Sequence, residues 1–392
     1  MRTTLIRGAR LIDGTGGPAV EPPVLLTAGG VIEAVGAEAA ARAPEATEVW
    51  DCGDQTLLPG LIDCHNHLSL DPTLDNYLHR MGDPLPELTI RAVNSMKVDL
   101  LAGVTTSRCL GDKGFLDIAC RKASALGTLL GPRLLVATRG IRAPHGHGFV
   151  GYPFSGVEQI RNAVRENLQA GADLIKVYIT GTLRGPGQIL HFYSREEIQA
   201  AVDEAHRVGV PVATHCIGGP GLRLAVETGI DVIEHGYFMT DEEIELLLKY
   251  DRWLVMTPSI FFTDARIHTL PPDLIDGHLQ QREEVGRRMA AAIRAGVHYA
   301  VGTDGMHAGL AREIAYLVKM GATPAAALQA ATADAAKVCG LADRTGTLQK
   351  GKLADCIGVE GNPLEVPGAL ERVRTVILEG RLIKAERNVS PS

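Results

Sequence analysis

The strongest constraint on the fold is a repeated alternation of short apolar segments with amphipathic ones. From about residue 100 onward, an apolar run of strand length is followed by a loop, a helix-like pattern ending near glycine, and another apolar run. This alternation is typical of βα units whose strands form a parallel sheet. The strands are almost continuously apolar, as expected when helices cover both faces of the sheet.

Eight strand segments can be placed in this way. Five are clear and three are weaker: GADLIKVYI (171–179), GVPVATH (209–215), GIDVIEH (229–235), RWLVMTP (252–258) and GVHYAVGTD (296–304), then LIDCHNH (61–67), GVTTSRC (103–109) and RLLVAT (133–138). Eight βα units match a (β/α)₈ barrel, which typically needs about 250 residues. An open doubly wound sheet is the rival, but no G-x-G-x-x-G follows an early strand and no Walker lysine motif occurs.

Helix-start signals support these units. Ser194 with Glu197 and Thr240 with Glu243 have the spacing of capping boxes, and Thr323-Pro324 combines an N-cap with proline at the first helical position. The segments between the apolar runs are therefore predicted to be helices.

The two chain ends differ from the middle. Residues 1–58 and 343–392 contain short alternating segments separated by glycine and proline turns. We expect these ends to pair into one small β-sandwich domain beside a barrel formed by residues 59–342.

Charge and cysteine usage narrow the partners. The net charge is −7 and no basic face stands out, so a nucleic-acid partner is not expected. No secretory leader or run of about 18 apolar residues occurs, and the seven scattered cysteines fit free thiols in a reducing compartment. We therefore expect a cytoplasmic protein without a membrane partner, which binds a small-molecule substrate and assembles as a homo-oligomer.

Two histidines end the first predicted strand, in the stretch LLPGLIDCHNHL (57–68). Residues two apart on a strand point to the same face, so His65 and His67 aim together at its carboxyl end. One core histidine bonded to the backbone would be ordinary, but two in register are costly to bury without partners. We interpret the pair as candidate metal ligands.

Polar side chains also occupy four other strands at or near their ends. Lys176 lies inside GADLIKVYI, His215 and His235 end the next two strands, and Asp304 ends the last. In a (β/α)₈ barrel the active site forms at the carboxyl ends of the strands. We expect these four side chains to converge there with the two histidines of the first strand.

Lys176 is the most informative of these residues. An ammonium in so apolar a strand would suffer a large desolvation cost, which favours the neutral amine. A neutral amine can take up carbon dioxide, and the resulting carbamate could bridge two divalent cations as a carboxylate does. A lysine reaching the rim of the barrel, or one forming a Schiff base, is the alternative.

At this point the residues resemble a known group, the amidohydrolase superfamily, in the branch with a metal-bridging lysine on strand four. The resemblance covers nearly the whole chain and includes LLPGLIDCHNHL, AGVTTSRCLG, GADLIKV, VATHCIGG, DVIEHG, VGTDG and the segment that starts at TPAAALQAATADAAKVCG. The chain looks most like the prolidase-like and imidazolonepropionase-like amidohydrolases, which hydrolyse dipeptides or N-acyl amino acids.

The resemblance implies a binuclear metal site and its chemistry. It assigns one cation to His65, His67, carbamylated Lys176 and Asp304, and the second to Lys176, His215 and His235. Zinc suits such nitrogen and oxygen ligands, although the sequence does not exclude other divalent ions. A metal-bridging hydroxide would attack the carbonyl carbon of an amide, with Asp304 as the general base that passes the proton to the leaving nitrogen.

Two residues near these strand ends are candidates for binding the substrate. His147 lies in APHGHGF (143–149), in a turn similar to one of the prolidase-like members, and could contact a substrate carbonyl or carboxylate. The sequence is equally consistent with His147 being an exposed residue of a loop. Tyr178 should share the face of Lys176 and could donate a hydrogen bond, unless it only packs in the core. His307 is a weaker candidate.

Other features would shape the pocket without defining the substrate. Arg139, Arg142 and Arg184 lie in loops where a guanidinium could bind a carboxylate, although solvated surface is the commoner environment. The segment SIFFTDARIHTLPPDLIDGHLQ (259–280) reads as a long loop, and we expect it to cover an apolar pocket.

Two positions depart from the pattern of the relatives. Cys109 stands where many relatives have an aspartate at the end of strand two. The sequence therefore does not determine which hydrogen bonds support the metal ligands on that side. Cys216-Ile217 follows His215, whereas some dipeptidase-like members have a tyrosine nearby, so peptide specificity does not transfer directly.

Three other functions remain open. The same site could hydrolyse a carbamate, ester or lactam xenobiotic. A mononuclear deaminase is disfavoured because those relatives have a glutamate three residues after the strand-five histidine, where this chain has Gly218. A catalytically silent barrel serving in assembly is disfavoured because all six ligand positions are filled.

Overall fold

The computed structural model describes residues 3–181, 188–268, 270 and 272–385, with only the backbone for residues 265, 266 and 272–274. Strands occur at all eight predicted places: β7 (Leu61–Asn66), β8 (Val104–Cys109), β9 (Arg133–Val136), β12 (Ile175–Tyr178), β13 (Val212–Cys216), β14 (Val232–His235), β15 (Trp253–Met256) and β16 (Tyr299–Val301). Each pair formed between two of these strands is parallel. The predicted α/β fold is confirmed.

The parallel strands are assigned to two sheets that meet at two seams. One sheet has the order β7-β8-β9 and the other β11-β10-β12-β13-β14-β15-β16, with the short additional strands β10 (Ile141–Arg142) and β11 (Tyr152–Pro153). At one seam the Asp173 amide donates to the Val136 carbonyl at 2.9 Å. At the other, the amides of Thr303 and Asp304 donate to the His65 carbonyl at 3.0 and 2.7 Å. The first and last parallel strands are therefore linked through their backbones.

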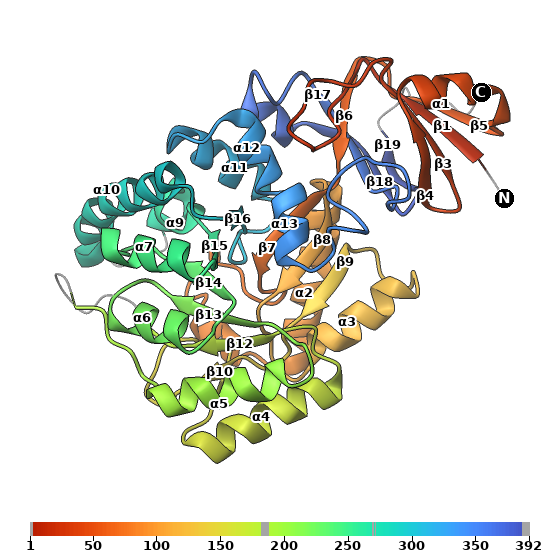
Figure 1. The fold of residues 1–392 in the computed structure, drawn as a ribbon. Helices are drawn as coiled ribbons and strands as arrows, with labels where there is room; N and C mark the ends of the chain where they lie inside the picture. Colours follow the sequence, from red (N-terminus) through yellow and green to blue (C-terminus); the bar gives the residue numbers. More distant parts are fainter. Residues whose placement is uncertain (1–2, 182–187, 269, 271, 386–392) are drawn as a thin grey trace.

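Helices lie on the outside of these strands (Figure 1). They are α2 (Leu85–Leu101), α3 (Leu116–Ala125), α4 (Val157–Ala170), α5 (Arg195–His206), α6 (Pro220–Glu227), α7 (Asp241–Lys249), α10 (Pro272–Ala295), α11 (Leu310–Lys319), α12 (Pro324–Gln329) and α13 (Ala333–Val338). The predicted capping boxes are present at α5 and α7, where Ser194 and Thr240 accept from the amides of Glu197 and Glu243. Thr323 caps α12 through the Ala326 amide.

The segment 259–280 differs from its prediction. It was expected to be a long loop, but it forms α8 (Ser259–Phe262), α9 (Asp264–Ile267) and the first turns of α10. Proline at the first position of α10 is compatible with a helix start, because proline lacks only an amide hydrogen that is unpaired there anyway. Pro272, which suggested a loop, therefore marks the beginning of a helix.

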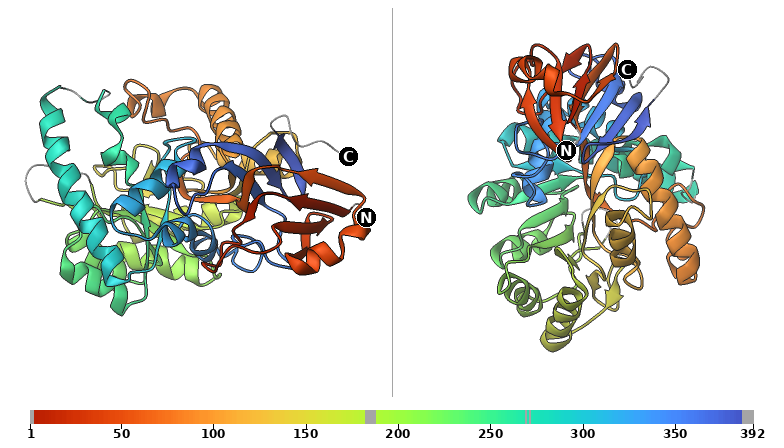
Figure 2. Two further views of the ribbon diagram at one scale, coloured as in Figure 1. Left: turned by 90° about the horizontal axis from the view of Figure 1, so that it is seen from above. Right: turned by 90° about the vertical axis from the view of Figure 1, so that its right-hand side faces the viewer.

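Both chain ends contribute to one group of strands beside the parallel strands. The first sheet has the order β4-β3-β1-β5 and the second β19-β18-β17-β6-β2, from β1 (Thr3–Arg7), β2 (Arg10–Leu11), β3 (Val24–Ala28), β4 (Val31–Val35), β5 (Glu48–Asp51), β6 (Gln55–Pro59), β17 (Cys356–Glu360), β18 (Val373–Leu378) and β19 (Arg381–Ala385). The short helix α1 (Ala37–Ala41) packs on β3. Figure 2 shows the red and blue strands side by side. The two sheets share a buried cluster that includes Ile6, Leu25 and Ile377.

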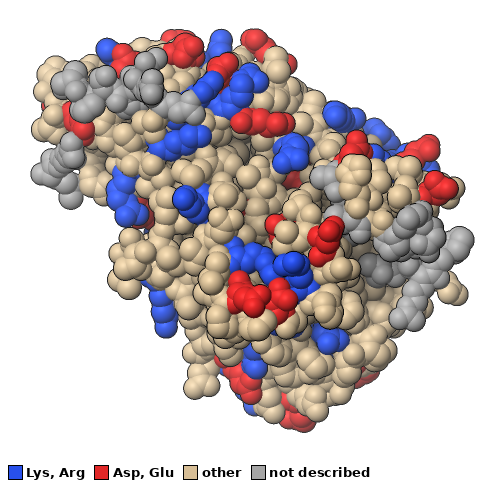
Figure 3. Space-filling model, turned by 180° about the vertical axis from the view of Figure 1, so that it is seen from behind, with Lys and Arg blue, Asp and Glu red and all other residues tan. Residues whose placement is uncertain are grey.

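The surface carries charges of both signs. On the face drawn in Figure 3, basic and acidic side chains are interspersed rather than gathered by sign. Among the residues that the structure describes, no helix is long and apolar enough to cross a membrane.

Candidate metal and substrate site

Polar side chains from distant segments meet at the carboxyl ends of the parallel strands. They come from β7 and the residue after it, from β12, β13 and β14, and from the loop after β16: His65, His67, Lys176, His215, His235 and Asp304. All six line one cavity of about 600 Å³. The predicted convergence of the six residues is therefore seen in the structure.

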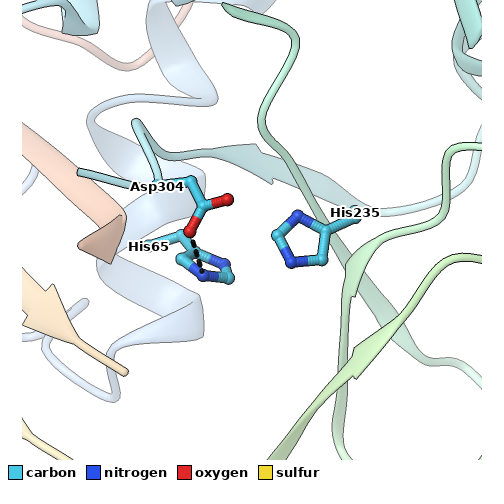
Figure 4. Close-up of side chains that lie close together, drawn as sticks. All are labelled: His65, His235 and Asp304. Atoms are coloured by element: carbon cyan, nitrogen blue, oxygen red, sulfur yellow. Dashed lines mark ion pairs between the residues drawn. The ribbon is translucent and has the colours of Figure 1, made fainter. Parts of the chain in front are cut away.

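Asp304 lies at the centre of one half of this group. Its Oδ1 is 3.2 Å from His65 Nε2 and 3.5 Å from His67 Nε2. Ligand atoms of His65, His235 and Asp304 all lie within 4.8 Å of one another, an arrangement that could hold a metal ion (Figure 4).

The other half contains Lys176 and His215. The ring centroids of His215 and His235 are 4.6 Å apart, and those of His65 and His235 are also 4.6 Å apart, so His235 stands between the two halves. The Lys176 side chain is completely buried, and its Nζ lies 5.1 Å from the centre of the Tyr178 ring.

The backbone at this site is unusual in two places. His235 has φ 79° and Asp304 has φ 51°, a region that residues with a Cβ seldom occupy and that costs about 1–3 kcal/mol each. Gly302 approaches so closely that a Cβ there would lie 2.3 Å from the His65 amide nitrogen. The absence of a Cβ at Gly302 lets the segment after β16 lie directly against the backbone of His65 in β7.

Three histidines are held by hydrogen bonds through Nδ1. The partners of His65, His67 and His235 are Glu234 Oε2 at 2.7 Å, the Gly111 carbonyl at 2.8 Å and the Thr257 hydroxyl at 2.8 Å. This pattern leaves Nε2 of each ring directed at the cavity, and it is the usual way in which metal-binding histidines are oriented.

Glu234 and Arg108 form a buried ion pair behind His65 that was not predicted. Arg108 Nη1 lies 2.9 Å from Glu234 Oε1 and 3.0 Å from the Cys64 carbonyl, and both side chains are almost fully buried. The signal was present in the sequence, because each is a charged residue inside an apolar strand, as Lys176 is.

The protein environment keeps most of these imidazoles neutral. Burial lowers the pKa of His67 to about 3 and holds the pKa values of His215 and His235 well below their usual range. Burial would also lower the pKa of His65, but the charges of Glu234 and Asp304 outweigh it and raise that pKa. Neutral imidazole is the form that binds a metal ion.

The pKa values of the two remaining groups, Lys176 and Asp304, are shifted in directions that suit metal binding. Burial lowers the pKa of Lys176 to about 8, against the opposing effect of Glu234 and Asp304. Burial raises the pKa of Asp304, but the adjacent His65 and His67 outweigh it, so this carboxyl has a pKa well below its ordinary value. Asp304 is therefore an anion, and the Lys176 amine loses its proton more readily than an exposed lysine.

These residues fit a divalent metal centre. Among the described residues, Lys176 Nζ and His215 Nε2 are buried without a hydrogen-bond partner, a costly state for atoms that face a cavity lined by other ligands. Imidazole nitrogens and a carboxylate are the donors that zinc prefers.

The other predicted residues have different environments. His147 lines the cavity, with its ring centroid 4.4 Å from that of His215. Tyr178 also lines it, on the same face as Lys176, and its hydroxyl is enclosed without a hydrogen-bond partner among the described residues. His307 instead bonds Asp99 and the Leu70 carbonyl.

The arginines do not bind at this cavity in the described part of the chain. Arg139 pairs with Glu166, and Arg142 donates to the carbonyls of Ala143 and Pro144. Arg184 lies outside the described residues.

The cysteines and Gly218 also have clear environments. Burial raises the pKa values of the Cys64 and Cys216 thiols, so both are poor thiolate ligands, as expected of small buried residues. Cys109 is buried in an apolar cluster with Met96. A Cβ at Gly218 would lie 2.9 Å from the backbone of Phe238, so a glutamate does not fit at the position where the deaminases have one.

Comparisons with known proteins identify the family of this chain. The family model described as the amidohydrolase family matches residues 56–383. Ochratoxinase of Aspergillus niger is 30% identical over 93% of this chain and 82% of its own, and imidazolonepropionase of Pseudomonas putida is 26% identical over 86% and 88%. The crystal structure of a Xaa-Pro dipeptidase with bound methionine has a TM-score of 0.84 and 28% identity, covering 98% of this chain and 100% of its own. The chain belongs to the amidohydrolase family and is a hydrolase that acts on carbon–nitrogen bonds.

Proposed function

We propose that the protein hydrolyses an amide bond in a small substrate, such as a dipeptide or an N-acyl amino acid, with two zinc ions. The proposed ligands are His65, His67, Lys176 as its carbamate, His215, His235 and Asp304. The observation that carries the proposal is the convergence of these six side chains on one cavity, where Lys176 Nζ and His215 Nε2 are buried with no hydrogen-bond partner among the described residues. The amide-hydrolysing relatives support the substrate class.

The carbamate would form on a deprotonated amine. Lys176 Nζ would attack carbon dioxide, a C–N bond would form, and one proton would leave the nitrogen for solvent. The lowered pKa of Lys176, which burial brings to about 8, makes the reactive neutral amine more abundant near neutral pH. The product is an anion that offers two oxygens where the bare amine offers one nitrogen.

Asp304 would move the proton in the hydrolytic step. Divalent cations bound here would acidify a water molecule and polarise the substrate carbonyl. Asp304 is an anion that contacts both His65 and His67, so it is placed to accept a proton at Oδ and deliver it to the leaving nitrogen. His147 and Tyr178, which line the same cavity, would bind the substrate.

The same proposal extends to the architecture. We infer that the two parallel sheets form one (β/α)₈ barrel over residues 59–342, supported by backbone hydrogen bonds at both seams. The strands of residues 1–58 and 343–392 would form one β-sandwich domain, supported by the cluster that both of its sheets share.

Metal and bicarbonate dependence tests this function. Apoprotein should regain activity on a panel of dipeptides, N-acyl amino acids and carbamates only when zinc and bicarbonate are both present. Lys176→Ala should lose bound zinc and activity together, measured by metal analysis and by release of the amine.

Lys249→Ala is the matched control, because Lys249 is an exposed lysine of α7. This variant should retain both zinc and activity. Full recovery of the wild-type apoprotein with zinc in carbon dioxide-depleted buffer would refute the carbamate, and activity on cytosine-like compounds with ammonia release would favour the deaminase instead.

A further inference from the structure

A continuous row of aromatic rings starts at the candidate metal site and extends along the cavity wall. The Tyr237 ring centroid lies 5.1 Å from that of His235, Phe261 lies 4.7 Å from Tyr237, and His278 lies 5.1 Å from Phe261. All four residues line the cavity. The row therefore connects a candidate zinc ligand with helix α10.

Phe261, in the middle of this row, meets two neighbouring rings edge to face. The Phe261 ring meets Tyr237 at 74°, and it meets Phe238, whose centroid is 5.9 Å away, at 89°. His278 is stacked on Phe261 with an interplanar angle of 7°. Tyr237, Phe238 and Phe261 thus form an aromatic corner, a name used below for these three residues.

The aromatic corner is held rigidly. Tyr237 contacts the Thr257 hydroxyl at 2.5 Å through its own hydroxyl. The backbone of α8, which carries Phe261, is fixed by Glu313 Oε2 on the Ser259 amide at 2.9 Å and by Arg282 Nε on the Phe261 carbonyl at 2.5 Å. These hydrogen bonds hold the rings in place before a substrate binds. Binding then needs no rearrangement of the rings, and a substrate group of complementary shape keeps its full binding free energy.

The remaining lining includes two further aromatic residues, Tyr77 and Phe149, and the polar side chain of Gln281. Apolar side chains continue the wall on several sides, among them Leu70, Val150, Ile217 and Ile260. A substrate group that enters this space is removed from water against apolar atoms.

We propose that the substrate carries a planar aromatic ring next to the scissile amide, and that the aromatic corner binds this ring, with Phe261 as the specificity-determining residue. The inference rests on the proposed function for the identity of the scissile bond. Because the corner begins beside His235, the ring must lie adjacent to that bond rather than at a distant end of the substrate.

An aromatic ring gains more binding free energy at the aromatic corner than a saturated ring of the same size. Both bury similar apolar area, but only the aromatic ring can make edge-to-face contacts with Phe261 and its neighbours. Such contacts add about 0.5–1.5 kcal/mol beyond the area buried, which corresponds to about twofold to twelvefold in affinity.

Calorimetric titration of the zinc-loaded protein with benzylphosphonate and cyclohexylmethylphosphonate tests the proposal. Wild-type protein should bind the benzyl compound about twofold to twelvefold more tightly. Phe261→Leu should bring the ratio close to one. Phe262→Leu is the matched control, because Phe262 lies on the same helix but packs on Tyr316, at a ring distance of 5.4 Å, outside the cavity lining.

Equal affinity for the two ligands in the wild-type protein would overturn the proposal, as would no binding of either. An equal loss of preference in Phe261→Leu and Phe262→Leu would also overturn it. The proposed function is read separately, from hydrolysis of N-benzoylglycine and N-(cyclohexanecarbonyl)glycine. A ring preference in binding without hydrolysis of any amide would refute the proposed function and leave the aromatic corner intact.

Discussion

Arg108, Lys176 and Glu234 are charged residues buried in the parallel strands, and the structure separates these three into two kinds. Arg108 and Glu234 neutralise each other through a contact of 2.9 Å. Lys176 is equally buried, but among the described residues its nitrogen has no hydrogen-bond partner. A buried charge with a partner is a structural feature, whereas a buried nitrogen without one points to a group that is bound during function.

Replacing Glu234 with glutamine should weaken metal binding. The amide would hold the His65 ring less firmly, so zinc affinity should fall about tenfold to a hundredfold. The substitution also leaves Arg108 as an unpaired buried charge, which should lower the free energy of unfolding by about 3 kcal/mol. Competition with a zinc chelator and urea unfolding measure the two effects.

Glu313→Gln is the control for this prediction. Glu313 is also fully buried, but burial raises its pKa well above the ordinary value, which favours the neutral form, and its Oε2 accepts a hydrogen bond from the Ser259 amide. Glutamine there should leave zinc affinity unchanged. A folded Glu234→Gln protein with wild-type zinc affinity would exclude a positioning role for Glu234.

The positions of the candidate ligands could be predicted from the sequence because each is a local anomaly. A histidine pair with a spacing of two, or a lysine in an apolar run, conflicts with core packing wherever the strand lies. The aromatic corner could not be predicted in this way. Tyr237, Phe238 and Phe261 are unremarkable hydrophobic residues in the sequence, and only the path of α8 brings them together.

At the scale of elements, strands and helix starts were predictable and the segment after β15 was not. Capping residues act within one turn, so Ser194 and Thr240 determine the starts of α5 and α7 locally. Helix α8 is only four residues long, and contacts from α10 and α11 hold it in place. Such distant contacts leave no periodic pattern in the sequence.

His307 joins three elements near the site and should make stability depend on pH. Its Nδ1 bonds Asp99 of α2 at 3.0 Å, and its Nε2 bonds the Leu70 carbonyl, beyond β7, at 2.9 Å. Burial alone would lower the pKa of His307, but Asp99 outweighs it and raises the pKa to about 9. The protonated ring donates both hydrogen bonds, and so it links helix α2 and the loop after β7 to the loop after β16.

Because this pKa is raised on folding, the stabilisation is complete below about pH 6.5 and is lost as pH rises through about 9. His307→Gln should therefore lower the free energy of unfolding by about 2 kcal/mol more at pH 6 than at pH 9.5, measured by urea unfolding. His298→Gln, at a side chain that is 62% exposed, is the control and should show no such difference. An equal cost of His307→Gln at both pH values would contradict the assignment.

At the scale of the whole molecule, Arg133 connects the parallel strands with the sheets of the chain ends. From β9 it contacts Asp355 at 2.9 Å and Glu379 at 2.7 Å, which flank β17 and β18. The Asp355 side chain is fully buried and also accepts from the Thr345 hydroxyl. The two parts of the molecule are therefore joined by a partly buried charge network, in which the Glu379 side chain is exposed. Assembly into a homo-oligomer stays a prediction.

Removing Arg133 alone should lower the free energy of unfolding more than removing the charges of both Arg133 and Asp355. Arg133→Met leaves Asp355 buried and unpaired, and should lower the free energy of unfolding by about 3–5 kcal/mol. The double variant Arg133→Met/Asp355→Asn should recover part of this loss, because no uncompensated charge remains. Urea unfolding of both variants gives the comparison, and a double variant less stable than the single one would show that the contact is important for its geometry rather than its charge.

The backbone bonds between His65 and the residues after β16 have a consequence for biosynthesis. A ribosome releases the two histidines of the first strand long before Asp304 is made, and β6 waits even longer for its partner β17. Early in translation the growing polypeptide thus holds unpaired strand edges and only two of the six proposed ligands, a state in which chains tend to aggregate. Zinc uptake would then be one of the last events in maturation, after nearly the complete polypeptide has left the exit tunnel.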